Sequence, residues 1–180
     1  MNRRILLLML PAAASVALVL ASPAAAAYPI VNPSFETGNF FGWTVVTAAS
    51  GGAASVIPGS APYAGAGTHE AYLTPGAVNA YTTVSQTVSA AAGSRLAGWA
   101  YFDNHDGGGF CDDAYVKVGS VTVFHGNSCT TGTTGWVHWS YTVPIAGGYT
   151  ITSGVANGGD GLVPSFLYVD DFRYLGPYAP

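Results

Sequence analysis

Hydrophobic and polar positions alternate in short segments along most of this chain. Segments rich in Val, Ile, Thr, Tyr, Phe and Trp are separated by clusters of Gly, Pro, Asn and Ser, and the spacing of an amphipathic helix is almost absent. This pattern predicts a series of β-strands. We expect them at Gly42–Val46, Ala54–Ile57, His69–Leu73, Tyr81–Val88, Arg95–Phe102, Ala114–Val118, Val121–Phe124, Val137–Val143, Tyr149–Ala156 and Phe166–Leu175.

So many short strands in about 150 residues are typical of a two-sheet sandwich or a barrel. Gly119 and Ser120, between two of the strands, are suited to a tight hairpin turn. No internal repeat and no long linker divides the chain. We therefore expect one all-β domain at residues 28–180.

The first 27 residues have the pattern of a cleaved secretion signal. Arg3 and Arg4 supply the positive start, an apolar run follows, and alanines precede the expected cleavage point after Ala27. A transmembrane anchor is the rival interpretation, but Pro11 and the alanine-rich end argue against it. We expect a secreted, extracellular protein without a membrane anchor.

The charge balance narrows the class of partner. Loss of residues 1–27 removes two of the five basic residues, which leaves three basic against nine acidic residues and a formal charge of −6. Neutralising phosphates requires clustered Lys and Arg, so the composition disfavours nucleic acid. It is compatible with a neutral ligand or with a cation held by carboxylates.

Cys111 and Cys129 are the only cysteines. In an exported chain, two cysteines are expected to form a disulfide. A metal site would need more thiol or imidazole ligands nearby, and His125 alone does not supply enough of them.

Aromatic residues alternate with core residues in several of the predicted strands. Trp99 and Tyr101 fall on one side of their strand, and Leu96, Ala100 and Phe102 fall on the other. The same alternation in two further strands leads us to expect one sheet surface that displays Trp99, Tyr101, Tyr115, Lys117 and His138 together.

Two motifs carry a resemblance to a known family. The segment from Asn32 to Glu36 reads Asn-Pro-Ser-Phe-Glu and is followed by Gly-Trp at Trp43, and a strand near the end reads Val-Asp-Asp-Phe from Val169. These elements resemble the opening and closing strands of calcium-stabilised jelly-roll carbohydrate-binding modules, in the galactose-binding-like superfamily. The resemblance implies an antiparallel jelly-roll β-sandwich and a carbohydrate ligand.

The resemblance also implies a structural Ca²⁺ site. Its ligands would be Glu36, Asp171 with Asp170 as the alternative, and carbonyl oxygens of the loop that ends at Thr68. The physics agrees, because Ca²⁺ prefers oxygen ligands and facing carboxylates repel one another without a cation. The alternative is that Glu36 and the two aspartates are solvated turn charges.

The aromatic content favours sugar binding, because a flat ring packs against the apolar face of a pyranose while polar side chains meet its hydroxyl groups. The competing interpretation is that most of these rings belong to the core. The residues predicted to bind ligand are Trp99, Tyr101, Tyr115, His138, Asn104 and Asp113.

An acidic, glycine-rich segment, residues 103–115, is the remaining candidate for chemistry. It carries Asp103, Asp106, Asp112 and Asp113 beside His105. These carboxylates could hold a second calcium ion, or two of them could flank a glycosidic bond in a hydrolase. The alternative is an exposed polar loop. The Gly-x-Ser-x-Gly and His-Glu-x-x-His motifs are absent. The enzyme question stays open, with catalysis disfavoured.

Three functions therefore remain. The leading hypothesis is a secreted, non-catalytic, lectin-like protein that binds carbohydrate and holds a structural calcium. The second is a small secreted polysaccharide hydrolase or lyase that uses the acidic loop from Asp103 to Asp113. The third is a secreted structural or protein-interaction β-sandwich.

Overall fold

The computed structural model describes residues 30–59, 62–63, 65–107 and 109–177. All ten predicted strands are present, with ends that differ from the prediction by a few residues. The strands are β1 (Thr44–Val46), β2 (Ala53–Pro58), β3 (His69–Thr74), β4 (Thr82–Ala90), β5 (Arg95–Asp103), β6 (Asp113–Val118), β7 (Val121–Asn127), β8 (Gly135–Thr142), β9 (Gly147–Ala156) and β10 (Phe166–Leu175).

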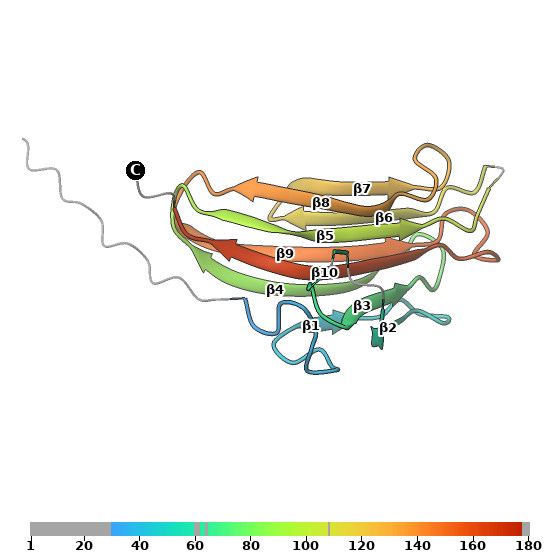
Figure 1. Cartoon of the computed structure of the whole chain (residues 1–180). Coiled ribbons are helices and arrows are strands. Elements are labelled where there is room, and N and C mark those ends of the chain that lie inside the picture. The colour runs from blue at the N-terminus through green and yellow to red at the C-terminus, as the bar shows by residue number, and fades with distance from the viewer. Residues whose placement is uncertain (1–29, 60–61, 64, 108, 178–180) are drawn as a thin grey trace, which may run out of the picture.

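The strands form two five-stranded sheets that lie one over the other (Figure 1). The first sheet has the order β1-β4-β9-β6-β7 and the second has the order β2-β3-β10-β5-β8, with antiparallel pairing throughout. The predicted all-β, two-sheet antiparallel sandwich is confirmed. The predicted signal at residues 1–27 lies outside the described residues. Among the residues that the structure describes, no helix is long and apolar enough to cross a membrane.

The core lies between the sheets and is built from every second residue of the strands. Trp139 on β8 packs over Gly98 on β5, where a Cβ atom would lie only 2.7 Å from the indole ring. Trp43 from the opening motif packs against Phe172 of β10 with ring centroids 4.7 Å apart. Large apolar side chains of both sheets thus interlock, and a glycine makes room for the bulkiest of them.

The opening motif closes one side of this core beside the last strand. Phe172 donates a backbone hydrogen bond of 2.9 Å to the carbonyl of Pro33. The indole N–H of Trp43 donates to the carbonyl of Asn32 at 3.1 Å, and Phe35 is fully buried with a φ of 55°. A bulky residue in that left-handed region is uncommon, so burial of the Phe35 ring holds the turn in place.

The prediction of one surface displaying five aromatic and charged residues is wrong. Trp99 and Tyr101 on β5 and His138 on β8 share one sheet, whereas Tyr115 and Lys117 on β6 belong to the other. Alternation reveals which residues share one side of a strand, but it does not reveal which sheet that strand joins. The molecule therefore has two separate candidate faces.

Candidate functional site

Glu36 of the opening motif is tied to the loop that precedes β3. Its carboxylate accepts hydrogen bonds from the backbone amides of Thr68, at 2.9 Å, and His69, at 2.8 Å, and from the Thr68 hydroxyl at 3.1 Å. Burial acts to raise the pKa of Glu36, but these hydrogen bonds outweigh it and leave the pKa lowered. Glu36 is thus an ionised carboxylate beside the predicted calcium loop.

Asp170 on β10 is a completely buried carboxylate. Its Oδ1 accepts a hydrogen bond from the next backbone amide at 2.6 Å, and its Oδ2 has no partner among the described residues. Burial, and then the carboxylates of Asp171, Glu70 and Glu36, raise the pKa of Asp170 to about 8. Several acidic groups therefore converge near one oxygen atom that nothing satisfies.

Asp171 occupies a different environment. It sits at a bulge of β10 with a φ of 49°, and its Oδ2 accepts hydrogen bonds from the Tyr63 hydroxyl at 2.6 Å and from Nε of Arg173 at 2.8 Å. Arg173 already supplies a counter-charge to this carboxylate. Of the two aspartates, Asp170 is the one with a buried oxygen that has no described partner, and a hard cation could satisfy it.

No group of three or more His, Cys, Asp or Glu side chains within the described ranges has the arrangement of a metal site. A Ca²⁺ ion at Glu36 and Asp170 would therefore need backbone carbonyl oxygens as well, such as that of Thr68. Calcium accepts such mixed oxygen sets readily. The buried Oδ2 of Asp170, which has no described hydrogen-bond partner, could be one ligand in such a set.

Trp99 and Tyr101 lie on the outer face of the β2-β3-β10-β5-β8 sheet, where aromatic rings form a row across the strands. Tyr101 stacks on Tyr168 at 5.3 Å between centroids with 21° between the ring planes. Trp136 flanks Tyr101 at 5.9 Å, and Tyr72 flanks Tyr168 at 5.0 Å. The Tyr101–Tyr168 pair is stacked and the other two pairs are tilted, and all three contacts join neighbouring strands.

Trp99 is half-buried in the same face. Its ring contacts Tyr63 at 5.8 Å and His138 at 5.0 Å, and Tyr63 is held over it by Asp171. Asn104, also predicted to meet a ligand, accepts a hydrogen bond from the amide of Asp106 at 3.1 Å. The described contacts of these predicted ligand residues are with neighbouring protein groups.

A groove of about 510 Å³ opens on this sheet face beside the aromatic row. Two of its residues, Glu70 on β3 and Asp103 on β5, are acidic. The described residues that line it are Ile57, Pro58, Gly59, Glu70, Tyr101, Asp103 and Tyr168.

Tyr115 and Asp113 lie on the outer face of the other sheet. The Tyr115 ring reaches across Gly154 of β9, where a Cβ atom would lie 2.9 Å from the ring carbon that bears the hydroxyl. The positions around the ring carry small residues, including Thr83 and Thr152. This aromatic ring therefore lies along the sheet surface, with small neighbours at its tip.

Polar groups surround the Tyr115 ring. Tyr81 packs against it at 4.9 Å between centroids, and Nζ of Lys117 lies 4.0 Å from its centre. Asp113 accepts a hydrogen bond from the Tyr81 hydroxyl at 2.7 Å and contacts Nε2 of His125 at 2.6 Å. Burial, and then Asp113, raise the pKa values of Tyr81 and Tyr115, so both phenols are neutral in physiological solution.

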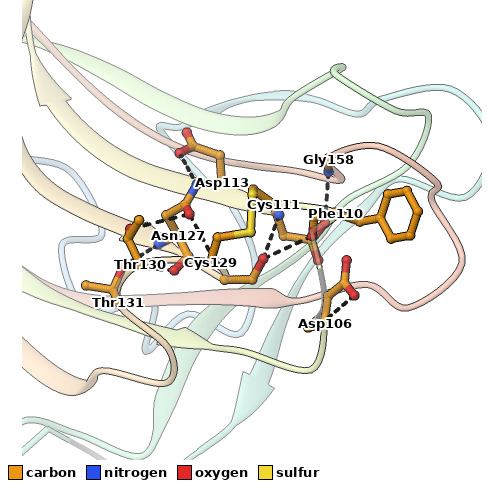
Figure 2. The surroundings of a disulfide bond; sticks show 12 residues. Asp106, Phe110, Cys111, Asp113, Asn127, Cys129, Thr130, Thr131 and Gly158 are labelled. Carbon is orange, nitrogen blue, oxygen red and sulfur yellow. Dashed lines mark hydrogen bonds between the residues drawn. A yellow bond between two sulfur atoms is a disulfide. The ribbon is translucent and has the colours of Figure 1, made fainter.

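The predicted disulfide between Cys111 and Cys129 is confirmed, with 5.2 Å between the Cα atoms (Figure 2). It joins the acidic segment to the turn after β7. Asn127 organises that turn, because its side-chain oxygen accepts the amide of Cys129 at 3.1 Å and its carbonyl accepts the amide of Thr131 at 2.8 Å. The disulfide thus cross-links two ordered segments of one end of the sandwich.

The acidic segment has a structural part. Asp112 is buried, and its two carboxylate oxygens accept the backbone amides of Gly158 and Ser165, each at 2.8 Å. Asp112 therefore anchors the β9–β10 loop to the disulfide. Asp103 and Asp113, which the hydrolase hypothesis required together, lie on opposite outer faces of the sandwich.

No protein-family model and no curated protein sequence matches this chain. Solved structures do. A family 61 carbohydrate-binding module in complex with β-1,4-galactotriose matches 83% of this chain and 99% of its own length at 20% identity, with a TM-score of 0.50. A carbohydrate-binding module of the β-sandwich superfamily, described as having promiscuous specificity, matches 79% of this chain and 60% of its own at 15% identity, with a TM-score of 0.53.

This chain shares the fold of carbohydrate-binding modules. The predicted resemblance is therefore confirmed at the level of the fold. The same sandwich also occurs in an adhesin domain of Lys-gingipain from Porphyromonas gingivalis, which matches 86% of this chain and all of its own at 11% identity, with a TM-score of 0.54. At these identities the likeness concerns architecture, and function must be argued from the site.

Proposed function

We propose that this protein is a secreted, non-catalytic carbohydrate-binding protein and that Tyr115 is its sugar-stacking residue. The observation that carries the proposal is the Tyr115 ring lying across Gly154, on a sheet surface of small residues. Such a ring packs against the apolar face of a pyranose. Carbohydrate-binding modules of the same fold, among them one solved with β-1,4-galactotriose, add support from a second direction.

The groups around Tyr115 are suited to the hydroxyls of a sugar. Asp113 accepts hydrogen bonds, Lys117 donates them, and His125 does either according to its protonation. A carbohydrate needs this mixture, because each buried hydroxyl must find a polar partner. Asp113 and Tyr115 were both predicted as ligand residues, and Tyr81 joins them here.

Binding of oligosaccharides to the Tyr115 face is tested by titration calorimetry with β-1,4-galactotriose and xylohexaose. Tyr115→Ala should weaken binding by about tenfold or more, the loss expected when one well-packed aromatic contact is removed. Tyr115→Phe is the matched control, because it keeps the ring and should retain most of the affinity. A folded Tyr115→Ala protein with unchanged binding would reject the Tyr115 face.

The proposal includes a structural calcium held by Glu36, Asp170 and the carbonyl of Thr68. The unpartnered Oδ2 of Asp170 and its neighbouring carboxylates support it. A bound Ca²⁺ would supply the positive charge that this acidic cluster lacks. Its role would be structural, because it would link the opening motif to β10.

Calcium is tested by thermal unfolding. A metal that binds only the folded state raises the melting temperature by mass action, so Ca²⁺ should raise it and EDTA should lower it. Glu36→Gln and Asp170→Asn should each remove most of that response. Asp160→Asn, which alters an acidic residue in the β9–β10 loop, should leave the response intact, and identical melting in Ca²⁺ and EDTA would reject the site.

A further inference from the structure

The groove on the β2-β3-β10-β5-β8 sheet is a second candidate site, on the face opposite Tyr115. Its volume of about 510 Å³ is within the range of pockets that hold small ligands. Tyr101 and Tyr168 form one wall, Ile57 and Pro58 contribute apolar surface, and two carboxylates complete the lining.

Glu70 is the unusual member of this lining. The residue is only 4% exposed, and its Oε2 has no hydrogen-bond partner among the described residues. Gly59 packs directly against it, since a Cβ atom there would lie 2.0 Å from the Glu70 carboxyl carbon. A buried carboxylate oxygen without a donor is costly, and its position in a groove points to a donor that arrives with a ligand.

Asp103 supplies the second carboxylate. It contacts Nε2 of His105 at 3.0 Å, and both it and Tyr101 line the groove. Burial, and then Asp103, raise the pKa of Tyr101, so this phenol is a neutral hydrogen-bonding group. The groove therefore combines acceptor oxygens with tyrosine rings, and the described residues of its lining include no basic side chain.

We propose that this groove binds a sugar that carries a free ammonium group, such as a glucosamine unit of a polysaccharide. The ammonium would donate hydrogen bonds to Glu70 and Asp103 and lie against the tyrosine rings, which attract cations through their electron-rich faces. The pyranose ring would pack on Ile57 and Pro58. A neutral sugar would bring no positive charge to match the two carboxylates. The groove lies on the face opposite Tyr115, so this proposal goes beyond the Tyr115 site and does not depend on it.

The test compares the hexamers of β-1,4-glucosamine and β-1,4-N-acetylglucosamine in buffer near neutral pH, by titration calorimetry on the full protein. The two probes differ in the charge of the amine and in the acetyl group that removes it. The glucosamine hexamer should bind at least about tenfold more tightly, the difference expected of one charge-assisted hydrogen bond. Equal affinity would overturn the proposal.

Asp103→Asn and Asp160→Asn form a pair of variants. Each removes one negative charge, the first from the groove and the second from the β9–β10 loop, outside the described lining of the groove. Asp103→Asn should weaken the glucosamine hexamer about tenfold, while Asp160→Asn should leave its affinity within about twofold. Equal losses in both variants would mean general attraction to an acidic protein and would overturn the groove.

Glu70→Gln and a lysine hexapeptide complete the experiment. Glu70→Gln should weaken the glucosamine hexamer as Asp103→Asn does, and if it fails to fold, Asp103→Asn decides alone. A lysine hexapeptide that binds as tightly, with the same sensitivity to Asp103→Asn, would replace the sugar by a basic peptide and overturn the proposed ligand. Neutral oligosaccharide binding at Tyr115 is measured separately, so failure of either site is recognised independently.

Discussion

The ring of Tyr115 and the backbone of Gly154 are so close that a side chain at position 154 would collide with the hydroxyl end of the ring. The contact joins β6 to β9 across the outer face of their sheet. The glycine therefore determines how the ring is held at the surface. Two of the three nearest atoms belong to the far end of the Tyr115 side chain, which can move without disturbing the core, and the third is Cγ2 of Thr83 at 3.0 Å.

Gly154→Ala should preserve the fold and weaken oligosaccharide binding. The new methyl group would lift the Tyr115 ring from the sheet, so we expect several-fold weaker binding and a small change in melting temperature. Calorimetry with β-1,4-galactotriose and a thermal melt on the same sample measure both. Full affinity in Gly154→Ala would mean that the position of the ring does not matter to the ligand.

Asp112→Ala should destabilise the protein without abolishing the disulfide. The substitution removes the acceptors of two backbone amides, those of Gly158 and Ser165, and should lower the free energy of unfolding by about 3 kcal/mol. Urea denaturation gives this value. A change below about 0.5 kcal/mol would show that Asp112 does not anchor the β9–β10 loop.

The calcium-free protein should lose stability as pH rises from about 4 to about 8. Burial raises the pKa of Asp170 from its ordinary value of 3.8 to about 8, so in this window the folded state binds more protons than the unfolded chain. Unfolding free energy therefore decreases with rising pH. Melting in EDTA should show a steeper decline for the native protein than for Asp170→Asn, and Ca²⁺ should reduce the decline.

Parallel pH profiles of the native protein and Asp170→Asn in EDTA would contradict this assignment. Glu70 contributes in the same direction, because burial raises its pKa to about 7. Glu70→Gln is therefore the companion variant, and its profile should also be flatter than that of the native protein.

Trp99→Ala should cost stability and spare oligosaccharide binding at the Tyr115 face. The half-buried indole packs beneath Tyr63 and beside His138, so its removal should cost about 3 kcal/mol. Trp99 and Tyr115 belong to different sheets. Unchanged stability together with lost affinity for β-1,4-galactotriose would restore Trp99 as the sugar platform.

The strands and the disulfide could be predicted from the sequence because their signals are local. Alternation with turn residues located all ten strands, and two cysteines in one chain leave a single intramolecular pairing. The order of strands in the sheets could not be predicted in the same way. β6 forms a local hairpin with β7 but also pairs with β9, which is far along the chain, and this long-range pairing places Tyr115 in a different sheet from Trp99.

The candidate sites were predicted in part for the same reason. The motifs singled out Glu36 and Asp171, with Asp170 as the alternative, but the different surroundings of the two aspartates, with the bulge and Arg173 beside Asp171, could not be read from the sequence. Glu70 had a weaker signal, an acidic residue within a strand between a histidine and an alanine. Its burial became visible only when β3 was placed beside β10.

The place of β10 in its sheet has a consequence for how the molecule folds. β10 is the last described strand, yet it lies at the centre of its sheet and pairs with both β3 and β5. Without β10, the β2–β3 pair and the β5–β8 pair have no strand between them to join them. During synthesis, the β2-β3-β10-β5-β8 sheet therefore cannot form completely until residues 166–175 have been made. Long-range pairing of this kind also makes folding slow. A chain interrupted before β10 would expose two unpaired strand edges and the inner face of the other sheet, which is a form prone to aggregation.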